Sequence, residues 1–206
     1  MEIIRINSYQ DHRFSQEVLN QHGGFLVNGE PYEIKIVSAS EAVIKGPDSG
    51  VYEALIEDFR FYTPHITVFY DQNGDIYKEF APKTLIRVNL RDIQPSQFYV
   101  DSDKIQAIQS FILQPNDIII QVTKQDGRYI SLDGHTRLYF AVMQGWSEVL
   151  AVGEEFGEYI YGFVEEAIKR EIRTPYDLML ISHAEYEEKW NKFCDDYFAQ
   201  KEEKKR

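Results

Sequence analysis

The segment Asp117–Leu132 constrains the fold of this chain most strongly, because it combines two apolar, β-rich runs with a turn signal between them. The first run covers Asp117–Val122, and the second leads to Ile130–Leu132. Between them stands Lys124–Gly127, whose Asp-Gly pair is typical of a tight connection between antiparallel strands. The segment therefore predicts a β-hairpin.

A second local signal follows directly after this hairpin. Asp133 and Gly134 allow a sharp turn, and the run behind them ends at Gly145. Apolar residues recur in this run on one helical face: Leu138, Ala141 and Val142. The pattern predicts a strand, a tight turn and a helix, with Thr136 and Arg137 in the first helical turn.

The start of this helix combines the groups that bind an anion. Backbone N–H groups, the Thr136 hydroxyl and the Arg137 guanidinium favour phosphate, and Asp133 beside it suits Mg²⁺ binding or proton transfer. His135 can donate to a phosphate or stabilise charge during transfer. The alternative is a helix terminus capped by Asp133 or Thr136, with Arg137 in a surface ion pair and His135 satisfied by neighbouring backbone.

The stretch Leu132–Arg137, with the residues that follow it, resembles the nucleotide-binding core of the ParB/sulfiredoxin superfamily. Its DGHTR loop is most similar to that of the ParB-like free serine kinases, and the resemblance covers Ile86–Val152. It implies an α+β fold with a small mixed sheet. The residues that it implies for phosphate binding are Gly134, His135, Thr136 and Arg137.

The resemblance also implies ligands and a reaction. The expected cofactors are ATP or ADP, with CTP as a further candidate, and Mg²⁺ held by Asp133. The implied catalytic residues are Asp133, His135 and Gln97. The implied reaction transfers phosphate to a small hydroxyl-bearing substrate such as free serine.

Gln97 departs from the kinase pattern. In the serine kinases the loop after the first strand carries a Glu that acts as the catalytic base, and Gln97 is its nearest counterpart here. An amide cannot take a proton from a hydroxyl, so Gln97 can orient a substrate but cannot serve as the base. Asp92, Asp101 and Asp133 remain open as substitutes.

Two other activities of the superfamily are disfavoured. The catalytic Cys of sulfiredoxin falls where this chain has His135, and the single thiol, Cys194, lies far away in the sequence. The partition proteins carry an Arg-rich loop and a helix-turn-helix domain, whereas this loop keeps only Arg137 and no convincing helix-turn-helix follows. Sulfinic-acid reduction and DNA partition are therefore not expected.

Composition narrows the classes of partner and the compartment. The net charge is −12, from 34 acidic and 22 basic residues, which disfavours nucleic acid. One Cys rules out an internal disulfide framework and suits a reducing cytosol. Neither a signal peptide nor an apolar run of membrane-spanning length is recognisable, so we expect a cytoplasmic protein without a membrane partner. His12 and His22 lack partners at metal-ligand spacing, so no zinc site is predicted.

We expect three segments in the chain. Residues 1–84 form an α+β subdomain of no recognised family, residues 85–152 form the ParB/sulfiredoxin-like core, and residues 153–206 form C-terminal helices. In the last segment, Ser182 and Glu185 match a capping box that opens an aromatic-faced helix. These helices either cover the core or form the interface of a homodimer.

The remaining elements follow from local patterns. The N-terminal segment predicts a helix over residues 8–21, hairpins over 24–37 and 66–80, a strand over 42–46 and a helix through 52–59. The core predicts a strand over 85–90, an exit loop over 92–97 and a helix capped by Ser102 or Asp101, with Ile105, Ile108 and Ile112 on one face. The aromatic stretch Phe59–His65 either packs in the core or lines a ligand cleft, and packing is the commoner case.

Two function classes remain open. The first is a small-molecule kinase, and the second is a non-catalytic nucleotide-binding module for regulation or protein interaction. Gln97 in place of the expected Glu favours the second, whereas the loop Asp133–Arg137 is compatible with both. Nucleotide binding is the prediction that the two classes share.

Overall fold

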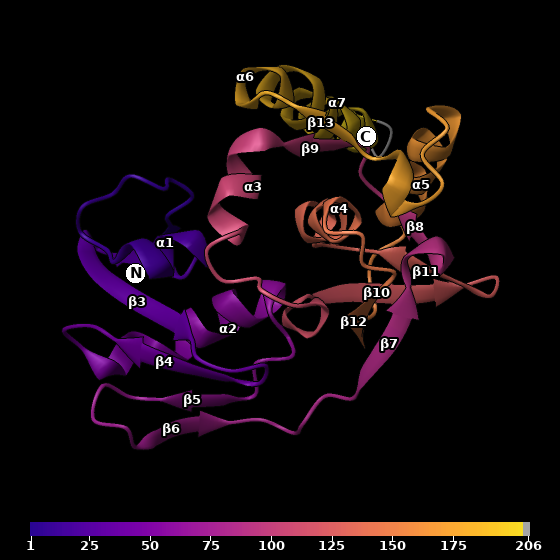
Figure 1. Cartoon of the computed structure of the whole chain (residues 1–206). Helices are drawn as coiled ribbons and strands as arrows, with labels where there is room; N and C mark the ends of the chain where they lie inside the picture. Colours follow the sequence, from indigo (N-terminus) through magenta and orange to yellow (C-terminus); the bar gives the residue numbers. More distant parts are fainter. Residues whose placement is uncertain (204–206) are drawn as a thin grey trace. The chain divides into compact units, whose positions relative to one another are not determined.

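The computed structural model describes residues 1–203 and has an α+β fold (Figure 1). The described chain forms two compact units: residues 1–86, 107–119 and 150–152 in the first, and residues 87–106, 120–149 and the chain from 153 onward in the second. The expected core 85–152 contributes to both units, and the last three residues of the expected C-terminal segment lie outside the described residues. Among residues 1–203, no helix has the length and apolar character needed to cross a membrane.

The first unit contains a six-stranded sheet in which sequence order equals spatial order. Its strands are β1 (Ile3–Arg5), β2 (Gly24–Val27), β3 (Glu30–Ile36), β4 (Glu41–Lys45), β5 (Val68–Tyr70) and β6 (Ile76–Glu79). Neighbouring strands are antiparallel except β4 and β5, which are parallel. A parallel pair needs a crossover connection, and helix α2 (Tyr52–Tyr62), with the 3₁₀ turn η1 (Ser49–Val51) before it, supplies it.

Local turn chemistry explains the hairpins of this sheet. Asn28 and Gly29 connect β2 to β3 with φ of 49° and 88°, the left-handed pair that a two-residue hairpin turn requires. One face of the sheet and helix α2 share a buried core that includes Phe25, Phe59 and Phe69. The predicted hairpins over 24–37 and 66–80 and the helix through 52–59 are confirmed.

The predicted helix over residues 8–21 is shorter than expected. Helix α1 covers Gln16–Asn20, and Ser15 caps its first turn. Before it, the Ser8 hydroxyl and the Asp11 carboxylate accept hydrogen bonds from backbone N–H groups two residues ahead. Such side-chain bonds offer the backbone a turn in place of a helix, which accounts for the later start.

A five-stranded sheet follows, with the order β7-β12-β10-β11-β8. Its strands are β7 (Leu85–Asn89), β8 (Ile93–Pro95), β10 (Ile119–Gln125), β11 (Arg128–Ser131) and β12 (Glu148–Gly153). The predicted hairpin over 117–132 is confirmed as β10 and β11, which pair antiparallel around Asp126 and Gly127 with φ of 49° and 83°. The predicted exit loop over 92–97 was wrong in part, because Ile93–Pro95 pairs parallel with β11.

A short parallel pair that the sequence did not predict lies in the second unit. Strands β9 (Tyr99–Asp101) and β13 (Met179–Ile181) form a two-stranded sheet. Helix α3 (Ser102–Ile108) begins directly after β9 and ends before Ile112, which is buried outside the helix. Short 3₁₀ turns η2 (Leu90–Asp92), η3 (Pro115–Asp117) and η4 (Pro175–Asp177) connect the elements.

The remaining helices belong to the second unit: α4 (His135–Met143), α5 (Tyr159–Lys169), α6 (His183–Tyr186) and α7 (Lys192–Glu203). A π-helical turn, η5 (Glu187–Asn191), joins α6 to α7. The predicted capping box is confirmed, because Ser182 and Glu185 satisfy each other's backbone N–H groups. The ring of Phe163 on α5 contacts Trp190, Phe193 and Tyr197, so α5 packs against η5 and α7 through aromatic side chains.

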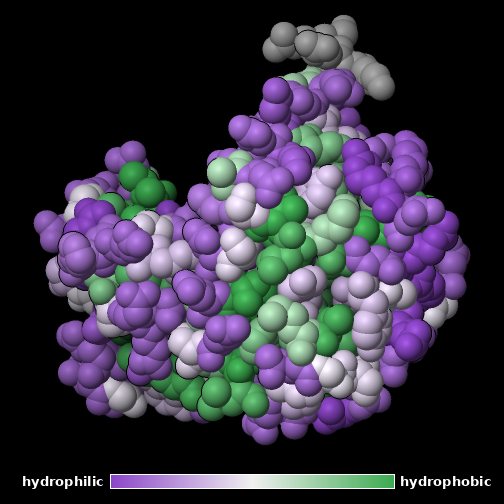
Figure 2. Space-filling view, turned by 45° about the horizontal axis from the view of Figure 1, so that its top comes forward, coloured by the Kyte–Doolittle hydropathy of each residue, from purple (hydrophilic) through white to green (hydrophobic). Residues whose placement is uncertain are grey.

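Apolar surface remains exposed in both units. Figure 2 shows green hydrophobic residues gathered among purple hydrophilic ones on one face of the molecule. Large exposed apolar side chains include Phe61 in the first unit and Tyr176, Met179 and Leu180 in the second. Scattered apolar exposure is normal for a folded chain and marks no site by itself.

Gly23→Ala is expected to destabilise the protein by about 1–3 kcal/mol, the usual cost of forcing an extra methyl group into a packed site. A Cβ on Gly23 would lie 1.8 Å from the backbone oxygen of Ile34, and the Gly23 oxygen itself accepts the Ile34 N–H at 2.8 Å. Urea denaturation of both proteins measures the difference. Gly153→Ala, where a Cβ would meet no atom within 4 Å, is the control and should change stability little. Equal effects of the two substitutions would contradict this packing.

Candidate functional site

Gly134 determines the geometry of the predicted phosphate loop. It follows strand β11, has φ of 87° and ψ of 19°, and is the N-cap residue of α4. A Cβ there would lie 2.6 Å from the Ile120 Cγ2 and 3.1 Å from the Arg137 Nη2. Both the left-handed backbone and the lack of space therefore require glycine.

The helix terminus at this loop differs from the simple capped terminus that we considered. The N-cap residue is Gly134 and not Asp133 or Thr136. Gly134 has no side chain, so no side chain of the N-cap residue accepts a hydrogen bond from the first turn. Leu138 donates its N–H to the Gly134 oxygen at 2.9 Å, the first bond of the helix. Thr136 is part of the first turn and is partly exposed.

Arg137 and Asp133 form an ion pair across the loop. The Arg137 Nη2 lies 2.8 Å from the Asp133 Oδ2, and the side chains are 21% and 45% exposed. This is the surface pair of the alternative interpretation. A guanidinium carries five N–H donors, so pairing with one carboxylate does not by itself prevent it from binding a second anion. The carboxylate does place a negative charge where phosphate would bind, and a cation such as Mg²⁺ would offset that repulsion.

His135 is buried, with 5% of its surface exposed, and its ring faces protein groups. Its Nε2 accepts the Ser96 N–H at 3.1 Å and lies 2.9 Å from the Ser131 hydroxyl oxygen. The pKa of His135 is lowered to about 4, mainly by burial; the negative charge of Asp133 opposes this shift, and the positive charge of Arg137 contributes to it. At neutral pH the imidazole is therefore uncharged, and its Nε2 holds β8 and β11 together.

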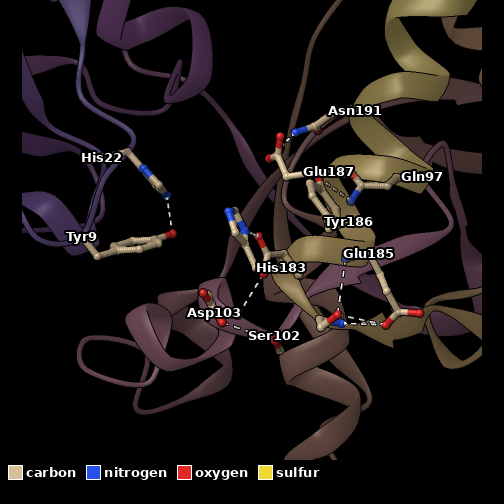
Figure 3. Close-up of polar contacts among 12 residues, drawn as sticks. Tyr9, His22, Gln97, Ser102, Asp103, His183, Glu185, Tyr186, Glu187 and Asn191 are labelled. Carbon is tan, nitrogen blue, oxygen red and sulfur yellow. Dashed lines mark hydrogen bonds and ion pairs between the residues drawn. The ribbon is translucent and has the colours of Figure 1, made fainter.

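Gln97 is also engaged with protein groups. Its Nε2 donates to the Tyr99 carbonyl oxygen and, at 3.1 Å, to the Tyr186 hydroxyl (Figure 3). Tyr186 is buried, and burial raises the pKa of its phenol well above the usual value. The amide therefore positions a phenol that stays protonated, and neither group accepts a proton at neutral pH.

The Tyr186 phenol links the loop to a second group of residues. Its titration is influenced electrostatically by Asp133 in the loop and by Asp101 at the end of β9. Asp101 is buried, and its Oδ1 accepts the Asp103 N–H at 2.9 Å at the start of α3. Its Oδ2 lies 2.7 Å from the His183 Nδ1, and this hydrogen bond raises the pKa of His183.

Asp101, Asp103 and His183 each place a ligand atom within 4.8 Å of the other two. Sequence reasoning considered Asp101 as a helix cap or a substitute base and missed this group. His183 is 82 residues from Asp101. Asp101 ends the three-residue strand β9 and His183 follows the three-residue strand β13, and strands this short are not recognised from their pattern. Asp92, the other substitute, is exposed at the end of η2.

Two further sequence features have structural explanations. In the aromatic stretch, Phe59 and His65 are buried, whereas Phe61 and Tyr62 are 61% and 41% exposed, so both packing and exposure occur. Burial raises the pKa of the Cys194 thiol to about 11, which keeps it protonated at neutral pH. An inert, packed cysteine is what its place on the aromatic face of the helix predicts.

Comparisons with known proteins add little. No family model matches the chain, and no curated protein matches it. A similar solved structure is the crystal structure of protein Atu1540 from Agrobacterium tumefaciens, with 17% sequence identity and a TM-score of 0.34. The match covers 47% of this chain and 61% of that chain, and at this level of similarity it supports no statement about the fold or the function.

The buried, neutral His135 should make folding pH-dependent. Its pKa is 6.5 when unfolded and about 4 when folded, so the unfolded chain binds more protons between these values. The stabilisation that the neutral His135 gives to the folded state is fully present above pH 6.5. The free energy of unfolding then falls by up to about 3 kcal/mol as the pH decreases to about 4. Urea denaturation across this range should show the decrease in the wild type and a smaller one in His135→Gln. The matched control His12→Gln, at an exposed position, should keep the wild-type profile; parallel profiles for all three proteins would be evidence against the assignment.

Proposed function

We propose that this chain binds a nucleotide through its phosphate groups at the loop Gly134–Arg137. The single observation that supports this most is the left-handed Gly134 at the start of α4, with Arg137 in the first turn. A helix start presents N–H groups and a partial positive charge, and a guanidinium adds planar, bidentate recognition of phosphate. The expected ligands are ATP or ADP, with CTP as a further candidate.

The resemblance of residues 132–137 to the ParB/sulfiredoxin superfamily belongs to this proposal. It provides the link between an anion-binding helix start and a nucleotide. The net charge of −12 makes nucleic acid an unfavourable ligand, whereas a single nucleotide accompanied by Mg²⁺ brings far less negative charge. In this proposal, Asp133 binds the Mg²⁺. The protein is located in the cytoplasm, where such nucleotides are abundant.

Of the two function classes, the side chains of the loop favour a non-catalytic module for regulation or protein interaction. Transfer to a hydroxyl acceptor such as free serine needs a group that takes the proton. Gln97 is an amide that donates to two protein oxygens, and the His135 Nε2 already accepts the Ser96 N–H. Asp133 is paired with Arg137. The small-molecule kinase is therefore the less well supported alternative.

Arg137→Ala should weaken nucleotide binding by about 1.5–3 kcal/mol, the range for hydrogen bonds to charged groups. A thermal-shift panel of ATP, ADP, CTP, GTP and pyrophosphate, each with and without Mg²⁺, first identifies the ligand, because a ligand specific for the folded state raises the melting temperature. Titration calorimetry then compares the variants. Arg170→Ala is a matched control, since Arg170 also forms an i,i+4 ion pair, with Glu166 at 2.6 Å. An Arg137→Ala protein with wild-type affinity would exclude the loop as the phosphate site.

The substitution Asp133→Asn tests Mg²⁺ binding separately from phosphate binding. The substitution removes the carboxylate paired with Arg137, so binding without Mg²⁺ should be as strong as in the wild type or stronger. The Mg²⁺ dependence of binding should disappear, because a neutral amide is a much weaker ligand for a hard cation. The measurement is the same calorimetric titration with and without Mg²⁺. If the variant still responds to Mg²⁺, Asp133 does not hold the metal.

A further inference from the structure

The ends of two parallel strands bring together side chains that the sequence separates widely. In the pair β9 and β13, Asp101 lies opposite Ile181, and both strands stop there. Helix α3 starts at Ser102 after β9, and α6 starts at His183 after β13. Because both strands run in the same direction, the residues that follow them lie at one edge of the sheet. Figure 3 shows His183 at this edge beside Ser102 and Asp103.

Three side chains at this edge have the chemistry of metal ligands. They are the carboxylates of Asp101 and Asp103 and the imidazole of His183, with all ligand atoms within 4.8 Å of one another. The Asp101 side chain is 2% exposed and that of His183 is 57% exposed, so the group is anchored inside and open to solvent on its outer side. Atoms bound to one tetrahedral cation lie roughly 3.4 Å apart for bonds of about 2.1 Å, so small rotations of the exposed side chains close this arrangement.

We propose that Asp101, Asp103 and His183 bind one divalent transition-metal cation, of which Zn²⁺ is the best match. An imidazole nitrogen with two carboxylate oxygens suits Zn²⁺ better than Mg²⁺ or Ca²⁺, which prefer oxygen ligands throughout. Three protein ligands leave at least one position for water or for a ligand from solution. The site is distinct from the loop Gly134–Arg137 and does not depend on the proposed nucleotide.

The surroundings of the three side chains orient them. The Asp103 N–H holds the Asp101 Oδ1 at 2.9 Å, which directs Oδ2 to the His183 Nδ1. The capping box of Ser182 and Glu185 holds the backbone at the start of α6. Glu187, one turn after His183, brings a further carboxylate to this helical segment (Figure 3). Groups that orient the ligands and a negative local field both favour cation binding.

The same residues also permit a simpler arrangement without a cation. In it, Asp101 and His183 form an ion pair that joins β9 to β13, and the Asp103 carboxylate takes no part in that pair. The two arrangements therefore differ in the role of Asp103. Substituting its carboxylate leaves the ion pair intact but removes one of three ligands from a metal site.

Sequence analysis predicted no zinc site, and the reason is visible here. That prediction rested on the lack of partners at metal-ligand spacing around His12 and His22. The proposed ligands come instead from two strand ends that are 82 residues apart, and two of the three are carboxylates. Spacing rules do not detect such a set.

The test is calorimetric titration of the metal-free, full-length protein with Zn²⁺, and in parallel with Mn²⁺ and Mg²⁺. We expect one Zn²⁺ per chain and weaker binding of Mg²⁺. Asp103→Asn and His183→Ala should each weaken Zn²⁺ binding by at least about tenfold, since loss of a ligand costs no less than loss of an orienting group. Asp103 is exposed, so its substitution spares the fold. Circular dichroism confirms folding of each variant.

Two control variants test nonspecific binding. His12→Ala removes another exposed histidine, and Asp126→Asn removes an exposed carboxylate from a hairpin turn that asparagine tolerates. Both should bind Zn²⁺ as the wild type does. The proposal is overturned if the wild type binds no Zn²⁺, if Mg²⁺ binds more tightly, or if Asp103→Asn keeps wild-type affinity. The last result would leave only the Asp101–His183 ion pair.

Discussion

The position of strand β11 is the constraint on which the second unit depends. It pairs antiparallel with β10 through a two-residue turn and parallel with β8 on its other side. Ile130 on this strand and Leu132 just after it pack against Ile160 of α5 in a shared apolar cluster. Because alternate residues of a strand face opposite sides, a shift of one residue would expose these side chains. The register of β11 therefore determines where the chain turns into the loop before α4.

From this strand the loop geometry follows step by step. Ser131 ends β11, and its hydroxyl lies 2.9 Å from the Nε2 of His135, while Ser96, directly after β8, donates its N–H to the same nitrogen. A buried imidazole with these partners joins two strand ends, and it is uncharged because burial disfavours the protonated form. Gly134 then has to adopt a left-handed conformation so that α4 can start with only three residues between it and the strand. His135 is thus a structural support of the loop, and Arg137 is a partly exposed cation in its first helical turn.

The second unit places two sets of charged side chains around one buried phenol. Burial raises the pKa of Tyr186, and the negative charges of Asp101 at the strand edge and of Asp133 in the loop both contribute to this shift. The Tyr186 hydroxyl accepts a hydrogen bond from the Gln97 amide. The loop pairs a carboxylate with a guanidinium, whereas the strand edge gathers two carboxylates and an imidazole. The first combination suits an anion with its counter-cation, and the second suits a cation. The proposed nucleotide and metal sites follow from this difference in charge.

Local chemistry explains how much could be predicted from the sequence alone. The hairpin turns at Asn28-Gly29 and Asp126-Gly127, the helix start at Gly134 and the capping box of Ser182 all depend on residues within a few positions of one another. Only the tertiary structure decided the parallel pairings of β8 with β11 and of β9 with β13. Three-residue strands carry no periodic signal, and the free energy of joining distant segments comes from packing that a local window does not contain. For this reason the sequence determined the loop Asp133–Arg137, whereas the meeting of Asp101 with His183 required the fold.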